Sequence, residues 1–257
     1  MKTISSRENA EYKALLKLAE GSRESRKQGR ALLDGPHLVA AYRAQVGLPE
    51  MLLISESGLD NDEIEAIVAA NAGSDMIVLK DALFKSLSGV SSPVGVAAVI
   101  AIPTTSAPFT GGSCVLLDAV QDAGNVGSIM RSSAAAGVRD IFLGPGCAGA
   151  WSPRVLRAAQ GAHFRLQIRE SVDLEDFVRS FKGRALTTVV SGGVPLRDAH
   201  LSGHIAWVFG SEGRGVRPSL VALASQTITI PMAAETESLN VAAAAAICLF
   251  ASAKPIQ

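Results

Sequence analysis

From residue 114 onward the chain alternates short, continuously apolar segments with segments of helical periodicity. The apolar segments predict strands at residues 115–118, 140–143, 164–168, 186–190, 205–209 and 227–230. The periodic segments predict helices at residues 127–136, 153–159, 174–181, 217–224 and 240–253. Strands without polar alternation are buried on both faces, which is typical of a parallel sheet covered by helices. We therefore expect an α/β fold with a parallel sheet for residues 114–257.

The chain has 257 residues, which suits two domains of about 100–150 residues each. Residues 23–102 predict a smaller α/β domain, with a helix that begins at Pro36, strands at 51–54, 76–79 and 95–102, and helices at 61–70 and 81–87. Residues 103–113 are rich in proline, glycine and hydroxyl side chains, so we interpret them as a linker. Residues 1–22 are expected to form a basic N-terminal extension.

The charge balance excludes a strongly basic nucleic-acid binder, because Lys+Arg and Asp+Glu both number 24. A local basic surface is still compatible with it. Arg23, Arg26, Lys27 and Arg30 lie in a basic stretch that is either a solvated helix face or a contact for phosphates.

Several other kinds of site are disfavoured. Residues 144–149 match the G-x-G-x-x-G pattern of dinucleotide-binding oxidoreductases, but the next helix is announced only by Ser152 and Pro153. His200 and His204 are four residues apart, but Gly203 disfavours a helix between them and no third ligand is evident. The three cysteines are too scattered for a metal site, so we expect no metal. The longest apolar run, residues 241–251, is shorter than a membrane helix, and no secretion signal is present, so we expect a cytoplasmic protein.

Three loops at the predicted carboxyl ends of strands are rich in polar residues and glycine. They lie within residues 116–131, 207–216 and 228–241. Parallel α/β sheets place ligands at this edge, where glycine permits close backbone approach and polar side chains supply donors and acceptors. Each loop alone is compatible with turn and capping chemistry, but the three together predict a ligand site.

These loops resemble the three motifs of the SpoU–TrmH family of RNA ribose 2′-O-methyltransferases, in the SPOUT superfamily. The first is similar to L-D-x-x-x-D-x-x-N-x-G-x-x-x-R, the second to F-G-x-E-x-x-G, and the third to I-P-M followed by S-L-N-V. The resemblance implies a C-terminal trefoil knot, a homodimer with the active site at its interface, and bound S-adenosylmethionine. It also implies a ribosomal-protein-like RNA-binding domain before the linker.

The resemblance implies catalytic positions at Asn125, Arg131, Glu212, Ser238 and Asn240. It implies cofactor-binding positions at Gly210, Ile230, Met232, Ser238 and Leu239, and we expect RNA contacts at Arg23, Arg26, Lys27, Arg30, Arg131 and Arg214. Arg131 matches the family arginine proposed to activate the ribose hydroxyl. A guanidinium is a poor base, so we expect it chiefly to orient the ribose or phosphate and to stabilise negative charge.

The residues next to Arg131 have subsidiary expected roles. Asn125 and Asn240 are expected to orient by hydrogen bonding, Ser238 to contact cofactor or substrate, and Glu212 to hold a neighbouring loop or cation. Ala242 stands where many relatives have serine. The sequence thus predicts methylation of a ribose 2′ hydroxyl in RNA, with ribosomal RNA favoured by analogy over tRNA. A non-catalytic RNA-binding protein on the same fold is the alternative from another class.

Overall fold

The computed structural model describes residues 2–105, 108–233 and 236–253. The chain divides into two compact units, each built on its own β-sheet. The first comprises Met1–Thr104 and Gly149–Phe164, and the second comprises Thr105–Ala148 and Arg165–Gln257. Within the described residues, no helix has the length and hydropathy needed to cross a membrane.

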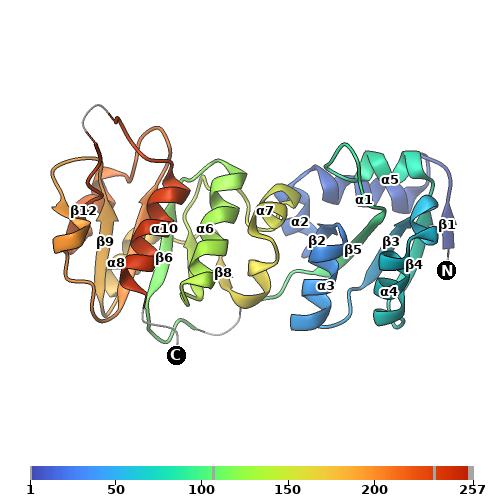
Figure 1. The fold of residues 1–257 in the computed structure, drawn as a ribbon, viewed down its shortest axis with the longest axis horizontal. Coiled ribbons are helices and arrows are strands. Elements are labelled where there is room, and N and C mark those ends of the chain that lie inside the picture. The colour runs from blue at the N-terminus through green and yellow to red at the C-terminus, as the bar shows by residue number, and fades with distance from the viewer. Residues whose placement is uncertain (1, 106–107, 234–235, 254–257) are drawn as a thin grey trace. The chain divides into compact units, whose positions relative to one another are not determined.

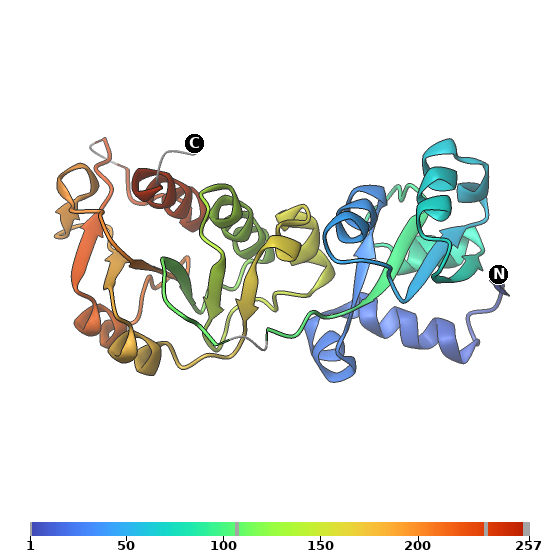
Figure 2. The same ribbon diagram turned by 90° about the horizontal axis from the view of Figure 1, so that it is seen from below.

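The second unit contains a seven-stranded sheet in the order β10-β12-β9-β11-β6-β7-β8, and all neighbouring strands are parallel. Its strands are β6 (Cys114–Asp118), β7 (Asp140–Leu143), β8 (Gln167–Arg169), β9 (Arg184–Thr188), β10 (Val194–Pro195), β11 (Ile205–Gly210) and β12 (Gln226–Thr229). Helices α6 (Ala123–Ala135) and α10 (Val241–Ser252) lie side by side on one face, and α8 (Leu174–Ser180) and α9 (Pro218–Leu223) cover the other (Figure 1, Figure 2). The predicted parallel α/β fold is confirmed.

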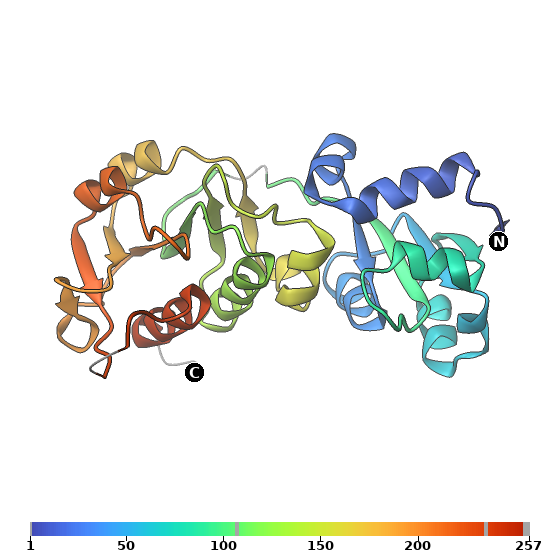
Figure 3. The ribbon, with the colours of Figure 1, turned by 90° about the horizontal axis from the view of Figure 1, so that it is seen from above.

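The first unit contains a five-stranded mixed sheet in the order β1-β4-β3-β5-β2. Its strands are β1 (Lys2–Ile4), β2 (Arg30–Asp34), β3 (Met51–Ser55), β4 (Asp75–Leu79) and β5 (Val96–Ala101). Helices α1 (Ala10–Glu20) and α5 (Asp81–Leu87) pack on one face through Tyr12, Leu15, Leu18 and Phe84, and α3 (Pro36–Gln45) and α4 (Asp62–Ala70) lie on the other (Figure 3). A short helix, α2 (Ser22–Gln28), precedes β2.

Residues 2–20 are part of this first unit rather than an extension from it. Strand β1 pairs with β4, and α1 buries Tyr12, Leu15 and Leu18 in the core. The Tyr12 hydroxyl donates to the carbonyl oxygen of Leu83 at 3.0 Å. These three residues recur at intervals of three, so one stripe of this highly charged helix is apolar. The prediction of an extension considered only the net charge of the segment and missed this stripe.

The segment Gly149–Phe164, which was expected in the C-terminal domain, also belongs to the first unit. It carries α7 (Pro153–Ala159), whose Arg157 Nη2 lies 3.2 Å from Asp34 Oδ2 on β2. Phe164 packs edge-to-face on Tyr42 of α3, with ring centroids 5.3 Å apart. Residues 162–165 form a 3-10 turn, so the strand predicted at 164–168 begins only at Gln167.

His163 lies in the core of the same segment and gives a testable pH dependence. Its Nε2 lies 2.7 Å from the Ala150 carbonyl oxygen, and its Nδ1 has no hydrogen-bond partner within the described part of the chain. Burial lowers the pKa of His163 to about 4, although the bond to Ala150 opposes this. The unfolded chain therefore binds the proton first, and stability is lost as the pH falls from about 6.5 toward about 4.

We expect this histidine to account for about 3 kcal/mol of the acid-dependent loss in unfolding free energy. Urea unfolding between pH 7 and pH 4 measures it. His163→Gln should flatten the profile, and His37→Gln, at an exposed histidine of the same unit, is the matched control. An unchanged profile in His163→Gln would contradict the prediction.

Candidate functional site

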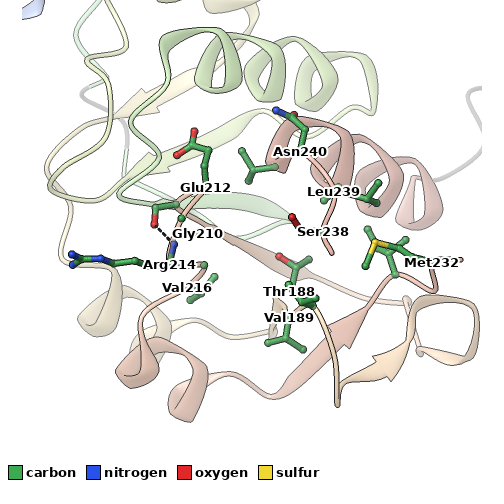
Figure 4. A pocket seen from close by; sticks show the side chains of 17 residues that line it. Thr188, Val189, Gly210, Glu212, Arg214, Val216, Met232, Ser238, Leu239 and Asn240 are labelled. Carbon is green, nitrogen blue, oxygen red and sulfur yellow. Dashed lines mark hydrogen bonds between the residues drawn. The ribbon is translucent and has the colours of Figure 1, made fainter. Parts of the chain in front are cut away.

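Parallel pairing gathers the carboxyl ends of four strands at one edge of the seven-stranded sheet. Gly210 at the end of β11 is in register with Asp118 at the end of β6, and Thr188 of β9 with Ile228 of β12. A cavity of about 580 Å³ opens there (Figure 4). Its lining residues are Thr188, Val189, Val190, Gly210, Ser211, Glu212, Gly213, Arg214, Gly215, Val216, Ile230, Met232, Ser238, Leu239, Asn240, Val241 and Ala244.

One wall of the cavity is the loop of residues 210–216, here called the glycine loop. Ser211 and Gly215 exchange two backbone hydrogen bonds, of 3.1 and 2.8 Å, which close the loop on itself. A Cβ on Gly210 would lie 2.0 Å from the carbonyl carbon of Gly215. Glycine is therefore required at position 210, because the backbone of the loop occupies the space that a side chain would take.

Asn125 reaches the site because α6 begins earlier than predicted. The Asp122 side chain accepts from the Asn125 backbone N–H at 2.8 Å and caps the helix, so α6 starts at Ala123 rather than Gly127. Asn125 therefore lies in the first helical turn, not in a preceding loop. From there Asn125 Nδ2 donates to Glu212 Oε1 at 2.8 Å.

Asn240 extends this contact into a chain of three polar side chains. Asn240 Nδ2 donates to Asn125 Oδ1 at 2.9 Å. Asn240 Oδ1 accepts from the backbone N–H groups of Ala242 and Ala243 at 2.9 and 3.3 Å, so it also caps α10. Figure 4 shows Glu212 and Asn240 at the same end of the cavity. The three predicted loops are thus joined by direct hydrogen bonds, and we call Glu212–Asn125–Asn240 the polar chain.

Glu212 is held as a carboxylate. Burial by itself raises the pKa of Glu212, but the Asn125 amide and backbone amides, including that of Asp122, donate to the carboxylate. The net effect places the pKa below the ordinary value for glutamate. Glu212 is consequently a hydrogen-bond acceptor that orients Asn125, and a weak proton acceptor.

The predicted cofactor residues converge on the cavity. Gly210, Ile230, Met232, Ser238 and Leu239 all line it, as do Glu212, Asn240 and Arg214. Asn125 joins through the polar chain. Arg131 does not line the cavity; it is exposed on α6.

The other predicted basic residues lie in the first unit. Arg23, Arg26 and Lys27 are exposed on α2, and Arg26 Nε donates to the carbonyl oxygen of Ser22 at 3.4 Å. Arg30 begins β2, and its Nε lies 2.8 Å from Glu50 Oε2. Arg30 is therefore the least available of the four for a phosphate.

Sequence reasoning missed one cavity wall. Thr188, Val189 and Val190 at the end of β9 line the cavity. Two signals could have indicated them: Ser191, Gly192 and Gly193 directly follow the predicted strand, and parallel sheets place ligands at the carboxyl ends of their strands.

The glycine-rich segment 144–149 does not lead into a helix as a dinucleotide-binding loop does. Helix α7 begins at Pro153, capped by Ser152, whose Oγ accepts from the Val155 N–H at 3.4 Å. The N-terminus of that helix starts after the glycines end, so it supplies no phosphate-binding amides within them.

A sequence model of the SpoU rRNA methylase family matches residues 112–250, which contain all three loops. This chain belongs to that family. The resemblance seen in the motifs is therefore confirmed.

Across its described residues, the chain has no cluster of three or more His, Cys, Asp or Glu that could hold a metal ion.

Relatives of known name cover nearly the whole chain. The 23S rRNA (guanosine(2553)-2′-O)-methyltransferase RlmP of Bacillus subtilis is 30% identical over 253 residues, which span 97% of this chain and 98% of RlmP. A TrmH-family RNA methyltransferase structure from Porphyromonas gingivalis is 29% identical, with a TM-score of 0.81 over 96% of this chain and 98% of that chain. The AdoMet-bound rRNA methyltransferase of Sinorhizobium meliloti shares the fold, with 24% identity, a TM-score of 0.84 and coverage of 98% and 97%.

Proposed function

We propose that this protein transfers a methyl group from S-adenosylmethionine to a ribose 2′ hydroxyl of ribosomal RNA. The observation that carries the proposal is the polar chain, which places Asn125, Glu212 and Asn240 beside a cavity walled by the glycine loop. The family match and the 2′-O-methyltransferase activity in the name of the Bacillus relative support it.

The cavity fits S-adenosylmethionine in size and lining. Its volume of about 580 Å³ lies within the range of small-molecule sites. Val189, Ile230 and Leu239 offer an apolar surface to an adenine ring, and Thr188 and Ser238 offer hydroxyl groups to the polar parts. Gly210 lets the backbone of Gly215 and Val216 pack against the end of β11, which gives this cavity wall its shape. When bound, the cofactor supplies a methyl group on a positively charged sulfur. The sulfur becomes a neutral thioether when the methyl group is transferred, so it is a good leaving group.

The residues of the chain then align the ribose and stabilise charge. The polar chain fixes the amide of Asn125, which can hold the ribose or its phosphate in line with the methyl group. Glu212 is a weak base, so its contribution is orientation. Arg131 supplies a fixed positive charge that stabilises the oxygen while its proton passes to solvent water.

We further propose a homodimer in which Arg131 of one copy completes the cavity of the other. Arg131 is absent from the cavity lining of its own chain. Helix α10 is built almost entirely of apolar and small residues, yet Ile247 is 42% exposed and Phe250 is 55% exposed. A second copy that covers this helix would bury both side chains.

The finer features of the fold and substrate binding are also proposals. A trefoil knot formed by the C-terminal segment is supported by the family and by the packing of α10 against α6. For RNA docking, we propose Arg23, Arg26 and Lys27 on α2 and Arg214 at the cavity as phosphate contacts. We also propose a cytoplasmic location, which the 23S rRNA substrate in the name of the Bacillus relative supports.

A labelling experiment tests the function. The protein is incubated with methyl-labelled S-adenosylmethionine and unmodified total RNA, which is sized and digested in alkali. A 2′-O-methyl group blocks alkaline cleavage, so label is expected in alkali-resistant dinucleotides from ribosomal RNA. Label in the tRNA fraction would change the substrate, and label in mononucleotides would mean base methylation. A protein that binds RNA but neither binds cofactor nor transfers label would be a non-catalytic RNA-binding protein.

Asn240 tests whether the polar chain serves the reaction or only caps a helix. Asn240→Asp keeps the oxygen that caps α10 but removes the Nδ2 donor to Asn125. We expect turnover in the same assay to fall about tenfold or more in Asn240→Asp and in Asn240→Ala. Only the alanine variant should also lose about 1 kcal/mol of unfolding free energy. Wild-type turnover in Asn240→Asp would reduce Asn240 to a helix cap.

A further inference from the structure

Asp118 and Arg217 form an ion pair directly behind the glycine loop. Asp118 ends β6, and its side chain is 4% exposed. Its Oδ2 accepts from the Arg217 backbone N–H at 2.8 Å, and its Oδ1 accepts from Arg217 Nε at 2.8 Å and Nη2 at 2.6 Å. One carboxylate therefore takes three hydrogen bonds from a single residue, which fixes both the backbone and the side chain of Arg217.

The pair touches the ends of two segments that build the site, although neither residue lines the cavity. Arg217 directly follows the glycine loop. Asp118 directly precedes the segment that leads to Asn125, and the next residue, Ala119, has a φ of 53°, in the left-handed region. A non-glycine residue with this φ is strained, and the neighbouring contacts must offset that strain.

The glycine loop is thus fastened at two places. At its tip Glu212 accepts from Asn125 Nδ2 at 2.8 Å and from the Asp122 backbone N–H at 3.4 Å. At its exit Arg217 is bound to Asp118. Between the two, the backbone hydrogen bonds of Ser211 and Gly215 close the loop on itself, so it would move as one unit. Without the contact between Arg217 and Asp118, the loop would be held only through Glu212. It would then shift, and the cavity wall would lose its shape.

We propose that Asp118 and Arg217 are positioning residues that hold the glycine loop in the conformation that binds S-adenosylmethionine. The inference rests on the proposed function, because it assumes that the cavity takes this cofactor. It predicts an effect on cofactor affinity rather than on the methyl-transfer step. A purely structural ion pair would instead change stability with no selective loss of affinity.

Calorimetric titration of the full-length protein with S-adenosylmethionine tests the proposal. Arg217→Ala is expected to weaken binding about tenfold or more, since it removes two hydrogen bonds to a buried carboxylate. Turnover at saturating cofactor should stay near the wild-type value, so KM rises while kcat does not fall. Guanidinium ion added to Arg217→Ala should restore part of the affinity by occupying the vacated place beside Asp118.

Arg169→Ala is the matched control. Arg169 ends β8, and its Nη1 lies 2.8 Å from Oδ1 of Asp140, which begins β7 in the same unit. Neither residue lines the cavity. Arg169→Ala should keep wild-type affinity. Wild-type affinity in Arg217→Ala, or an equal loss in Arg169→Ala, would overturn the proposal. If Arg217→Ala does not fold, Arg217→Lys replaces it in the test. Lysine keeps the positive charge but cannot donate from two nitrogen atoms to Asp118, so an unchanged Kd would overturn the proposal. Absence of binding by the wild-type protein would instead refute the proposed function.

Discussion

Replacement of Arg131 by alanine is expected to abolish methyl transfer while S-adenosylmethionine still binds with nearly wild-type affinity. Arg131 does not line the cavity of its own chain, so its removal leaves the cofactor contacts intact. The loss of a fixed positive charge beside a developing alkoxide costs about 10²–10³-fold in rate. Single-turnover label transfer and calorimetric titration measure the two quantities separately.

Arg139→Ala, at an exposed arginine just beyond the end of α6, is the matched control and should retain activity. A similar loss of affinity and of transfer in Arg131→Ala would make Arg131 a cofactor-binding residue. Undiminished transfer would remove it from the reaction.

Mixed subunits show whether Arg131 acts across a dimer. In a heterodimer of Arg131→Ala and Asn240→Ala chains, a site that takes its arginine from the partner would have both residues intact at one of the two cavities. The mixture should therefore be more active than either variant alone. If each cavity used its own arginine, both cavities would lack one residue and the mixture would be no more active than the two separate variants. That result would contradict the proposed interface.

The sequence predicted the second unit well because its strands are buried on both faces. A continuous apolar run such as that of β11 predicts a strand buried on both faces. The start of α6 was misplaced because Asn125 and Gly124 suggest a turn, whereas the Asp122 cap outweighs their low helix propensity. In the first unit, the charged residues of α1 concealed the stripe that contains Tyr12 and Leu15.

Features that depend on contacts between distant residues could not be predicted. Arg157 and Asp34 lie 123 positions apart, so nothing local assigns α7 to the first unit. The motifs did indicate Asn125, Glu212 and Asn240 as neighbours in a site. They could not show that the three side chains bond in one order, across separations of 87 and 115 positions. That order depends on strand register and on the start of α6.

Gly210→Ala is expected to eliminate measurable binding of S-adenosylmethionine. The added Cβ would lie 2.0 Å from the carbonyl carbon of Gly215 and 2.1 Å from the backbone nitrogen of Val216. These are backbone atoms of a loop closed by two hydrogen bonds, so no side-chain rotation can relieve the overlap. The loop must open, which removes one wall of the cavity and costs about 3 kcal/mol of unfolding free energy.

Gly213→Ala separates this steric effect from a general sensitivity of the loop. A Cβ at Gly213 meets no atom within 4 Å, so its unfolding free energy should match that of the wild-type protein. Calorimetric titration of Gly210→Ala and urea unfolding of both variants provide the comparison. Wild-type affinity in Gly210→Ala would mean that the glycine loop does not form the cofactor wall. Equal destabilisation in both variants would mean that the loop tolerates no side chain at either position. The close approach at Gly210 would then not explain the loss of binding in Gly210→Ala.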